Sequence, residues 1–176
     1  MTAVERSFAR VDAALKGYLR VLPTGRFISL FPCPQTGGSL QLTETTQSSL
    51  PDGLAHYLRA MNDKLSAILS ILTQQTLHED FPVPVLIHDI SGAGIRFSAN
   101  QEFELGQGVE VVIALSNQPQ SLAGAMGVVL RAEEHQGEAL WALEFKDMND
   151  CEREKIIQFV VARQREKIRE RHLAPS

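Results

Sequence analysis

Apolar and polar side chains alternate in the first part of the chain, and this pattern predicts short β-strands. The alternation runs from Leu15 to Val21, with leucine, glycine and valine between lysine, tyrosine and arginine. A period of two residues is typical of a strand with one buried face. A Pro-Thr-Gly turn at 23–25 precedes a second expected strand over 27–31, and a Gly-Gly turn at 37–38 precedes a further alternation at Leu40 and Leu42.

The period changes between residues 50 and 77, where the pattern predicts a long helix. Its apolar positions repeat with the heptad spacing of a helical seam: Leu58, Met61, Leu65, Ile68 and Leu72. Pro51 and Asp52 are suited to a helix start, and Pro82 to a stop. Such a stripe requires a packing partner. We expect self-association, as a dimer or tetramer, and the alternative is packing on the protein's own barrel.

Strand patterns return from Val83 to Phe145, separated by Gly and Asn turns. Five strands are expected, at 83–88, 94–98, 109–115, 123–131 and 139–145. Many short strands with regular turns favour a closed or nearly closed antiparallel barrel. A C-terminal helix is expected over about 149–172, with capping-box spacing between Asn149 and Glu152. One face of this helix is expected to carry its apolar residues: Ile156, Ile157, Val160, Val161 and Ile168.

Composition limits the classes of function. The 176 residues are 44% hydrophobic, which suits one domain with a packed core over 1–176, including an inserted helix at about 50–80. The net charge of −4 argues against binding of a nucleic-acid polymer, although local arginines can still hold a small anion. Cys33 and Cys151 lack the spacing of a zinc site or a disulfide framework, which favours free thiols in the cytoplasm. We expect no signal peptide and no membrane span.

Two short motifs carry candidate chemistry. Arg6 and Arg10 form an RxxxR pair ahead of the first strand, and Asp89, Ser91 and Gly94 form a DxSxxG turn between two later strands. Each motif alone is weak, because the first also occurs on solvated helices and the second in ordinary turns. Their order and their positions next to strands make the combination more informative.

In these motifs the sequence resembles the PilZ domain family of cyclic di-GMP receptors, whose ligand motif is RxxxR followed by (D/N)xSxxG. The strands at 127–131 and 142–145 and the helix from 156 to 166 resemble the corresponding family segments. The resemblance implies a mainly β fold with helices, namely a PilZ-like antiparallel barrel in a bacterial signalling protein. It also implies Arg6, Arg10, Asp89, Ser91 and Gly94 as the ligand-binding residues. The inserted helix resembles an oligomeric subgroup, in which tetramers are implied.

The residue types suit this ligand, which carries two phosphates and two guanines. An arginine fork can hold a phosphate or the O6 and N7 atoms of guanine, and it can stack on a base. Asp89 can accept hydrogen bonds from guanine N–H groups, the Ser91 hydroxyl can donate one, and Gly94 permits a tight turn or a close approach. We expect Arg6 and Arg10 to lie on a mobile arm that closes over the ligand.

The remaining candidates are interpreted as structural. His88 is expected to point away from Asp89, and Trp141 is expected to lie in the core. For Arg131 two positions are equally compatible with the sequence, a contact with the ligand or a place on the surface of its strand. The sequence has no GxSxG, GK[ST] or HExxH motif, so we expect no enzyme, no catalytic residues, no metal and no cofactor beyond the ligand. We expect a receptor that acts on an unknown protein partner, with motility, pili or exopolysaccharide as the outputs that the resemblance implies. The alternative is a ligand-independent oligomeric scaffold.

Overall fold

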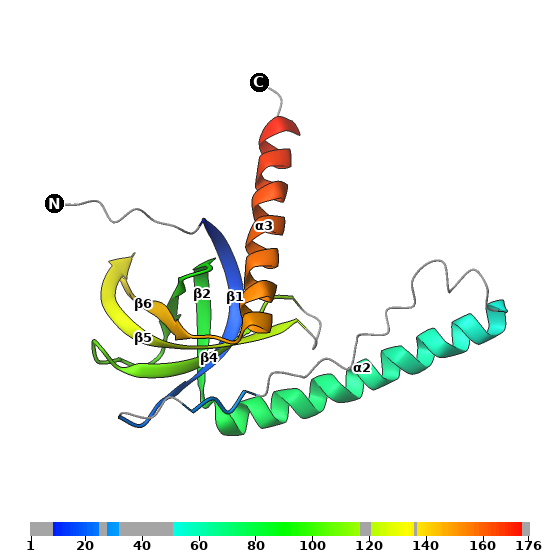
Figure 1. The fold of residues 1–176 in the computed structure, drawn as a ribbon, viewed down its shortest axis with the longest axis horizontal. Helices are drawn as coiled ribbons and strands as arrows, with labels where there is room; N and C mark the ends of the chain where they lie inside the picture. Colours follow the sequence, from blue (N-terminus) through cyan, green and yellow to red (C-terminus); the bar gives the residue numbers. More distant parts are fainter. Residues whose placement is uncertain (1–8, 25–27, 32–50, 117–120, 136, 174–176) are drawn as a thin grey trace.

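In the computed structural model, residues 9–24, 28–31, 51–116, 121–135 and 137–173 are described. Among them the strands are β1 (Arg10–Val21), β2 (Val83–Ser91), β3 (Gly94–Ala99), β4 (Gly108–Ala114), β5 (Leu122–His135) and β6 (Glu138–Asp147). They form a closed barrel in the order β1-β2-β3-β6-β5-β4, with every neighbouring pair antiparallel (Figure 1). The expected barrel is therefore confirmed, and closure leaves no unpaired sheet edge.

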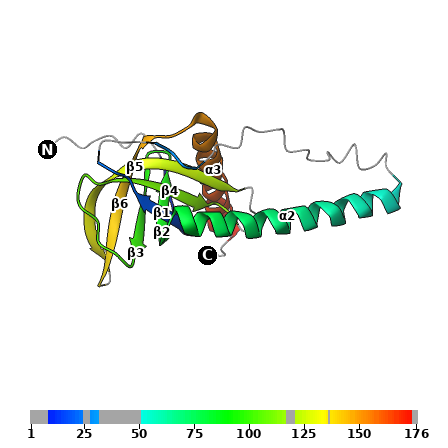
Figure 2. The ribbon, with the colours of Figure 1, turned by 90° about the horizontal axis from the view of Figure 1, so that it is seen from below.

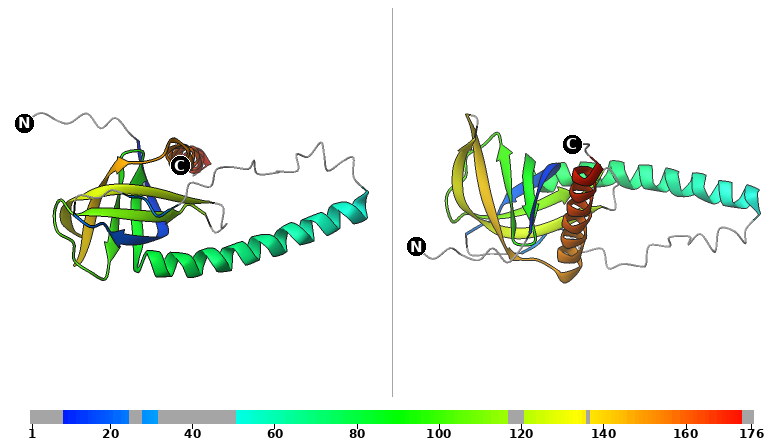
Figure 3. Two further views of the ribbon diagram at one scale, coloured as in Figure 1. Left: turned by 60° about the horizontal axis from the view of Figure 1, so that its bottom comes forward. Right: turned by 90° about the horizontal axis from the view of Figure 1, so that it is seen from above.

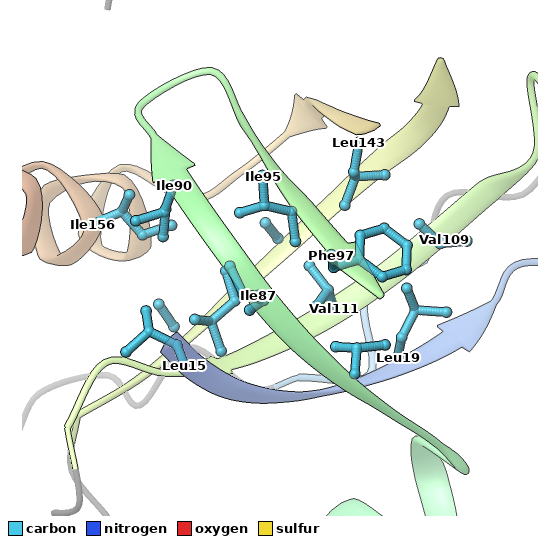
Figure 4. Close-up of a cluster of buried hydrophobic side chains, with 14 of the residues drawn as sticks. Leu15, Leu19, Ile87, Ile90, Ile95, Phe97, Val109, Val111, Leu143 and Ile156 are labelled. Atoms are coloured by element: carbon cyan, nitrogen blue, oxygen red, sulfur yellow. The ribbon is translucent and has the colours of Figure 1, made fainter. Parts of the chain in front are cut away.

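Alternating strand residues fill the interior of the barrel. Leu19, Ile87, Phe97, Val109 and Val111 are fully buried in one cluster (Figure 4). Trp141 joins this cluster, as its sequence position predicted, and its ring meets the Phe103 ring edge-on at a centroid distance of 5.3 Å. Gly17 is needed on β1, since a Cβ there would lie 2.9 Å from the Val112 carbonyl oxygen.

The strand expected over 27–31 is wrong where the structure describes it. Ile28–Phe31 forms no strand, because the backbone N–H groups of Leu30 and Phe31 donate to the Glu110 carboxylate of β4 rather than to a strand. Phe27 and the alternation at 40–42 lie outside the described residues, as does Cys33.

The inserted helix α2 (Asp52–Asp80) contacts the barrel at its C-terminal end (Figures 1 and 2). Leu77 and Phe81 pack there against Val112, and Tyr18 meets the His78 ring edge-on at 4.9 Å. Of the five heptad residues, Met61, Leu65, Ile68 and Leu72 are 46–54% exposed and Leu58 is half-buried. Packing of this seam on the protein's own barrel is therefore wrong, and the helix extends away from the barrel with its apolar stripe uncovered.

The C-terminal helix α3 (Asp150–Leu173) packs on the barrel with its first half, beside β1, β2 and β5 (Figure 3). Ile156 and Val160 enter the core cluster, whereas Ile168 is 54% exposed, so the expected apolar face ends earlier than its spacing suggested. The side chain of Asn149 caps the helix by accepting from the Cys151 N–H at 3.0 Å. Glu152 does not complete the expected capping box.

Glu152 instead turns toward the barrel, where it is buried. One of its oxygens accepts from the Gly124 N–H at 2.8 Å and the other from Lys155 Nζ at 2.7 Å. This contact joins the start of α3 to β5. Neither α2 nor α3, as far as the structure describes them, is long and apolar enough to span a membrane.

Candidate functional site

The antiparallel register brings both sequence motifs to one patch on the outer face of the barrel. Arg10 pairs with Ser91, Ser91 with Gly94, and Gly94 with Glu144. We call these four residues the motif row. Their chain neighbours lie in the core, and because successive strand residues face opposite sides, the motif row faces outward. These core neighbours are Val11, Ile90, Ile95 and Leu143.

A second row lies beside the first on the same face. It crosses strands β1, β2, β3, β6 and β5 through the pairs Asp12–Asp89, Asp89–Arg96, Arg96–Ala142 and Ala142–Arg131. We call these five residues the charged row. The two rows together place two arginines, Arg10 and Arg96, around the carboxylate of Asp89.

Asp89 is the centre of the patch. Its side chain is 1% exposed, Arg10 Nε lies 3.3 Å from Oδ1, and Arg96 Nε donates to Oδ2. Although Arg10 is close enough to form an ion pair, Oδ1 has no well-oriented hydrogen bond among the described residues. A buried carboxylate oxygen without a donor is unusual, and it can accept a hydrogen bond from an added N–H group.

Ser91 and Gly94 shape the turn between β2 and β3. The Ser91 hydroxyl donates to the Gly94 carbonyl oxygen at 3.2 Å and accepts from the Ala93 N–H at 3.3 Å. A Cβ on Gly94 would lie 2.1 Å from the Leu143 carbonyl oxygen. Glycine at this position is therefore required by the close approach of β3 to β6, and the hydroxyl of Ser91 is engaged inside the turn.

Arg10 is the first residue of β1, so the expectation that it lies on an arm ahead of the strand is wrong. Its pairing with Ser91 holds the backbone, while its side chain remains 38% exposed. Arg6 lies outside the described residues. The structure thus brings together Arg10, Asp89, Ser91 and Gly94.

Arg96 is a charged residue of the patch that the sequence reasoning missed. Its Nη1 lies 3.2 Å from Glu133 Oε2, and Arg131 Nε donates to Glu133 Oε1 at 2.6 Å. The hydrogen bond to Asp89 raises the pKa of Arg96 further above its ordinary value, and the bond from Arg131 lowers the pKa of Glu133. The tight turn from Ser91 to Gly94 was the available signal, since its register places Arg96 opposite Asp89.

His88 has a structural contact, as expected, but the expectation that it points away from Asp89 is wrong. The register shift between Ile87 and Asp89 interrupts the alternation of β2, and both side chains lie on the outer face of the barrel. His88 Nε2 lies 2.9 Å from the Ser98 hydroxyl.

Two cavities, of ≈ 290 and ≈ 620 Å³, lie elsewhere, the first beside Ser29 and Gly124 and the second beside Lys16 and Leu86. The motif residues line neither of these two cavities; Arg10 is the exposed member of the motif, whereas Asp89, Ser91 and Gly94 are buried beneath the outer surface.

Fold and patch define a small β-barrel module that presents arginines around a buried carboxylate on its outer face. The sequence model of the PilZ domain family matches residues 64–162, which is more than half of the chain, and the chain belongs to this family. The match begins within α2, so β1 and Arg10 lie ahead of it. A search of curated proteins found no match.

Solved structures share the fold. One is a pathogenic protein from Xanthomonas campestris, described as a tetrameric PilZ domain self-assembled through a helical bundle. It is 17% identical, with a TM-score of 0.59, and the alignment covers 93% of this chain and 91% of that one. The Bacillus subtilis inhibitor of motility is 14% identical with a TM-score of 0.55. That alignment covers 94% of this chain but 53% of that protein, so this chain spans about half of its length.

Proposed function

We propose that this protein is a receptor for cyclic di-GMP that passes ligand binding to a protein partner, and that it is not an enzyme. The observation that carries the proposal is the contact between Arg10 and Asp89, residues from the two halves of the family's ligand motif. They are distant in sequence and meet only because β1 pairs with β2.

The chemistry of the patch suits the ligand. Cyclic di-GMP is a dianion with two guanines, and the partly exposed Arg10 can offer its fork to a phosphate or to guanine O6 and N7. Asp89 Oδ1 lacks a well-oriented donor among the described residues, and a guanine N–H group can supply one. Ser91 and Gly94 hold the turn that positions Asp89.

Ligand binding would act on the segment ahead of β1. Arg6 stands four residues before Arg10, so a ligand held by Arg10 lies within reach of that segment. Ordering of a segment by ligand contacts is a known switching mode, and it would change the surface that a partner meets. Motility, pili or exopolysaccharide production are the outputs that we propose on the basis of family membership.

We further propose that α2 assembles the protein into a tetramer or a dimer. The exposed heptad residues Met61, Leu65, Ile68 and Leu72 support this, because a contiguous apolar stripe of this kind marks an interaction surface. This observation also favours a second candidate function, a scaffold that assembles without ligand.

Isothermal titration of the full-length protein with cyclic di-GMP tests the proposal. We expect binding by the wild type, and Arg10→Ala should weaken it by about 1.5–3 kcal/mol, or roughly 10- to 150-fold, because a charged hydrogen-bonding group is lost. Arg165→Ala, which removes an exposed arginine of α3, is the matched control and should bind like the wild type. No heat of binding, or equal affinity in Arg10→Ala, would exclude this receptor site.

Light scattering on Leu65→Lys tests the assembly. We expect the molar mass of the Leu65→Lys assembly to be lower than that of the wild type, because burying a charged group in an apolar seam without a partner is costly. If Leu65→Lys also abolishes partner binding while Asp89→Ala changes neither titration nor assembly, the scaffold is the better description.

A further inference from the structure

We infer that Arg96 is a further ligand-binding arginine of the proposed cyclic di-GMP site, and that Glu133 is a built-in competitor that occupies the place of an anion until the ligand arrives. This inference rests on the proposed function. It arises from the bridge that Glu133 makes between two arginines.

The position of Arg96 makes it available to a ligand. It follows Gly94 on the same outward face of β3 and stands opposite Asp89, beside the motif row. Its guanidinium reaches Asp89 through Nε and Glu133 through Nη1, yet the side chain remains 32% exposed. A ligand on Asp89 therefore lies next to this guanidinium.

Glu133 occupies a site that is built for an anion. One of its carboxylate oxygens faces Arg96 Nη1 at 3.2 Å and the other accepts from Arg131 Nε at 2.6 Å. Ala142 lies between the two arginines in the charged row, and its small buried side chain leaves room for both to reach the same carboxylate. Guanidinium forks bind phosphate and carboxylate oxygens with the same geometry, so a ligand phosphate can take the place of Glu133.

The charge balance favours this exchange. Among the described residues, Arg10, Arg96 and Arg131 form ion pairs with two carboxylates, Asp89 and Glu133. The other carboxylates of the two rows have lysine partners: Asp12 pairs with Lys167 at 2.8 Å and Glu144 with Lys146, so the patch keeps a net positive charge. A dianionic ligand meets a surplus of positive charge, and local charge of the opposite sign raises affinity. Glu133 is itself partly exposed, and partly exposed ion pairs are weak, so little is lost when it yields to a phosphate.

The inference predicts opposite effects from the two partners of one ion pair. Isothermal titration of the full-length protein with cyclic di-GMP should show weaker binding by Arg96→Gln, by about tenfold or more, because a charged hydrogen-bond donor is lost. Glu133→Gln should bind about two- to fivefold more tightly, because the competing charge is gone while the side-chain size is kept. Glu134→Gln is the control, since it removes the same charge from the adjacent exposed position of β5, and it should stay within about twofold of the wild type.

The results of these titrations distinguish failure of the inference about Arg96 and Glu133 from failure of the proposed function. If both Arg96→Gln and Glu133→Gln weaken binding, or if neither changes it while Arg10→Ala does, the inference is overturned and the proposed function stands. If the wild type does not bind, the proposed function fails and the inference fails with it. Since Arg96→Gln leaves Asp89 with Arg10 as its remaining ion-pair partner among the described residues, that variant can lose stability. Glu133→Gln keeps the Asp89–Arg96 contact, and tighter binding by that variant supports the inference even where Arg96→Gln does not fold.

Discussion

A buried carboxylate on the outside of β4 should be one of the strongest single contributions to stability in this protein. Glu110 is 1% exposed and accepts from Arg20 Nε and from Ser29 Oγ, each at 2.6 Å. It also accepts from the backbone N–H groups of Leu30 and Phe31 at 3.1 Å. Arg20 lies 5.8 Å from the centre of the Phe81 ring, which packs at the end of α2. Glu110 therefore connects the barrel, the 28–31 segment and the base of the inserted helix.

Glu110→Ala should lower the free energy of unfolding by about 3 kcal/mol, near the lower end of the range for breaking a buried ion pair. The lower end applies because Arg20 is 16% exposed and the 28–31 segment lies at the surface. Water can therefore replace some of the hydrogen bonds that the Glu110 carboxylate accepted. Urea unfolding at fixed protein concentration, followed by the fluorescence of Trp141 in the core, measures the change. The control is Glu102→Ala, which removes an exposed carboxylate and should change stability by less than about 0.5 kcal/mol.

A double variant sharpens this prediction. In Arg20→Met with Glu110→Leu, no charge is left without its partner, so the pair of changes should cost less than Glu110→Ala alone. Two results would contradict the stabilising role of Glu110. One is a loss of less than about 1 kcal/mol of unfolding free energy in Glu110→Ala, and the other is a double variant that is the least stable of the series.

Two further predictions concern the site and its surroundings. Gly94→Ala should destabilise the protein by about 3 kcal/mol or more, because its Cβ would meet the Leu143 carbonyl oxygen, a backbone atom that cannot move without shifting β6. The control is Gly53→Ala in α2, where a Cβ meets nothing within 4 Å; urea titration should show no loss there, and equal behaviour of the two variants would contradict the packing argument. Arg131 lowers the pKa of Glu133, so the stability that ionised Glu133 contributes is present above the ordinary glutamate pKa of about 4.3 and is lost as the pH falls through its lower folded-state pKa. The difference in unfolding free energy between wild type and Glu133→Gln should therefore shrink as the pH is lowered below about 4.3, and a difference that grows in acid would refute this sign.

Local periodicity was enough to predict most of the fold. Strands with alternating burial, such as 15–21 and 109–115, became β1 and β4, because one face of each packs into a single core. The segment 27–31 has a similar composition, but the backbone N–H groups of Leu30 and Phe31 donate to Glu110, a contact between residues far apart in sequence. Periodicity also could not show where α3 leaves the barrel, and so it placed the exposed Ile168 on a packed face.

The candidate site was partly predictable for the same reason. The motif letters identified Arg10 and Asp89, and the pairing of β1 with β2 brings them together. Arg96 could have been found by extending the register of the Ser91–Gly94 turn by two residues. Its second partner, Glu133, could not, because the register between β5 and β6 shifts between Val129 and Arg131, and such an irregularity depends on packing across the whole barrel.

The proposed site for cyclic di-GMP lies on the outer face of the barrel, where β1, β2 and β3 meet. Hydrogen-exchange mass spectrometry of the full-length protein, with and without the nucleotide, tests both binding and location in one measurement. We expect slower exchange with nucleotide in peptides that cover 89–96, and unchanged exchange at 122–126 beside the cavity near Gly124. Unchanged exchange at 89–96, or protection at 122–126 in its place, would show that the nucleotide does not bind at the proposed site.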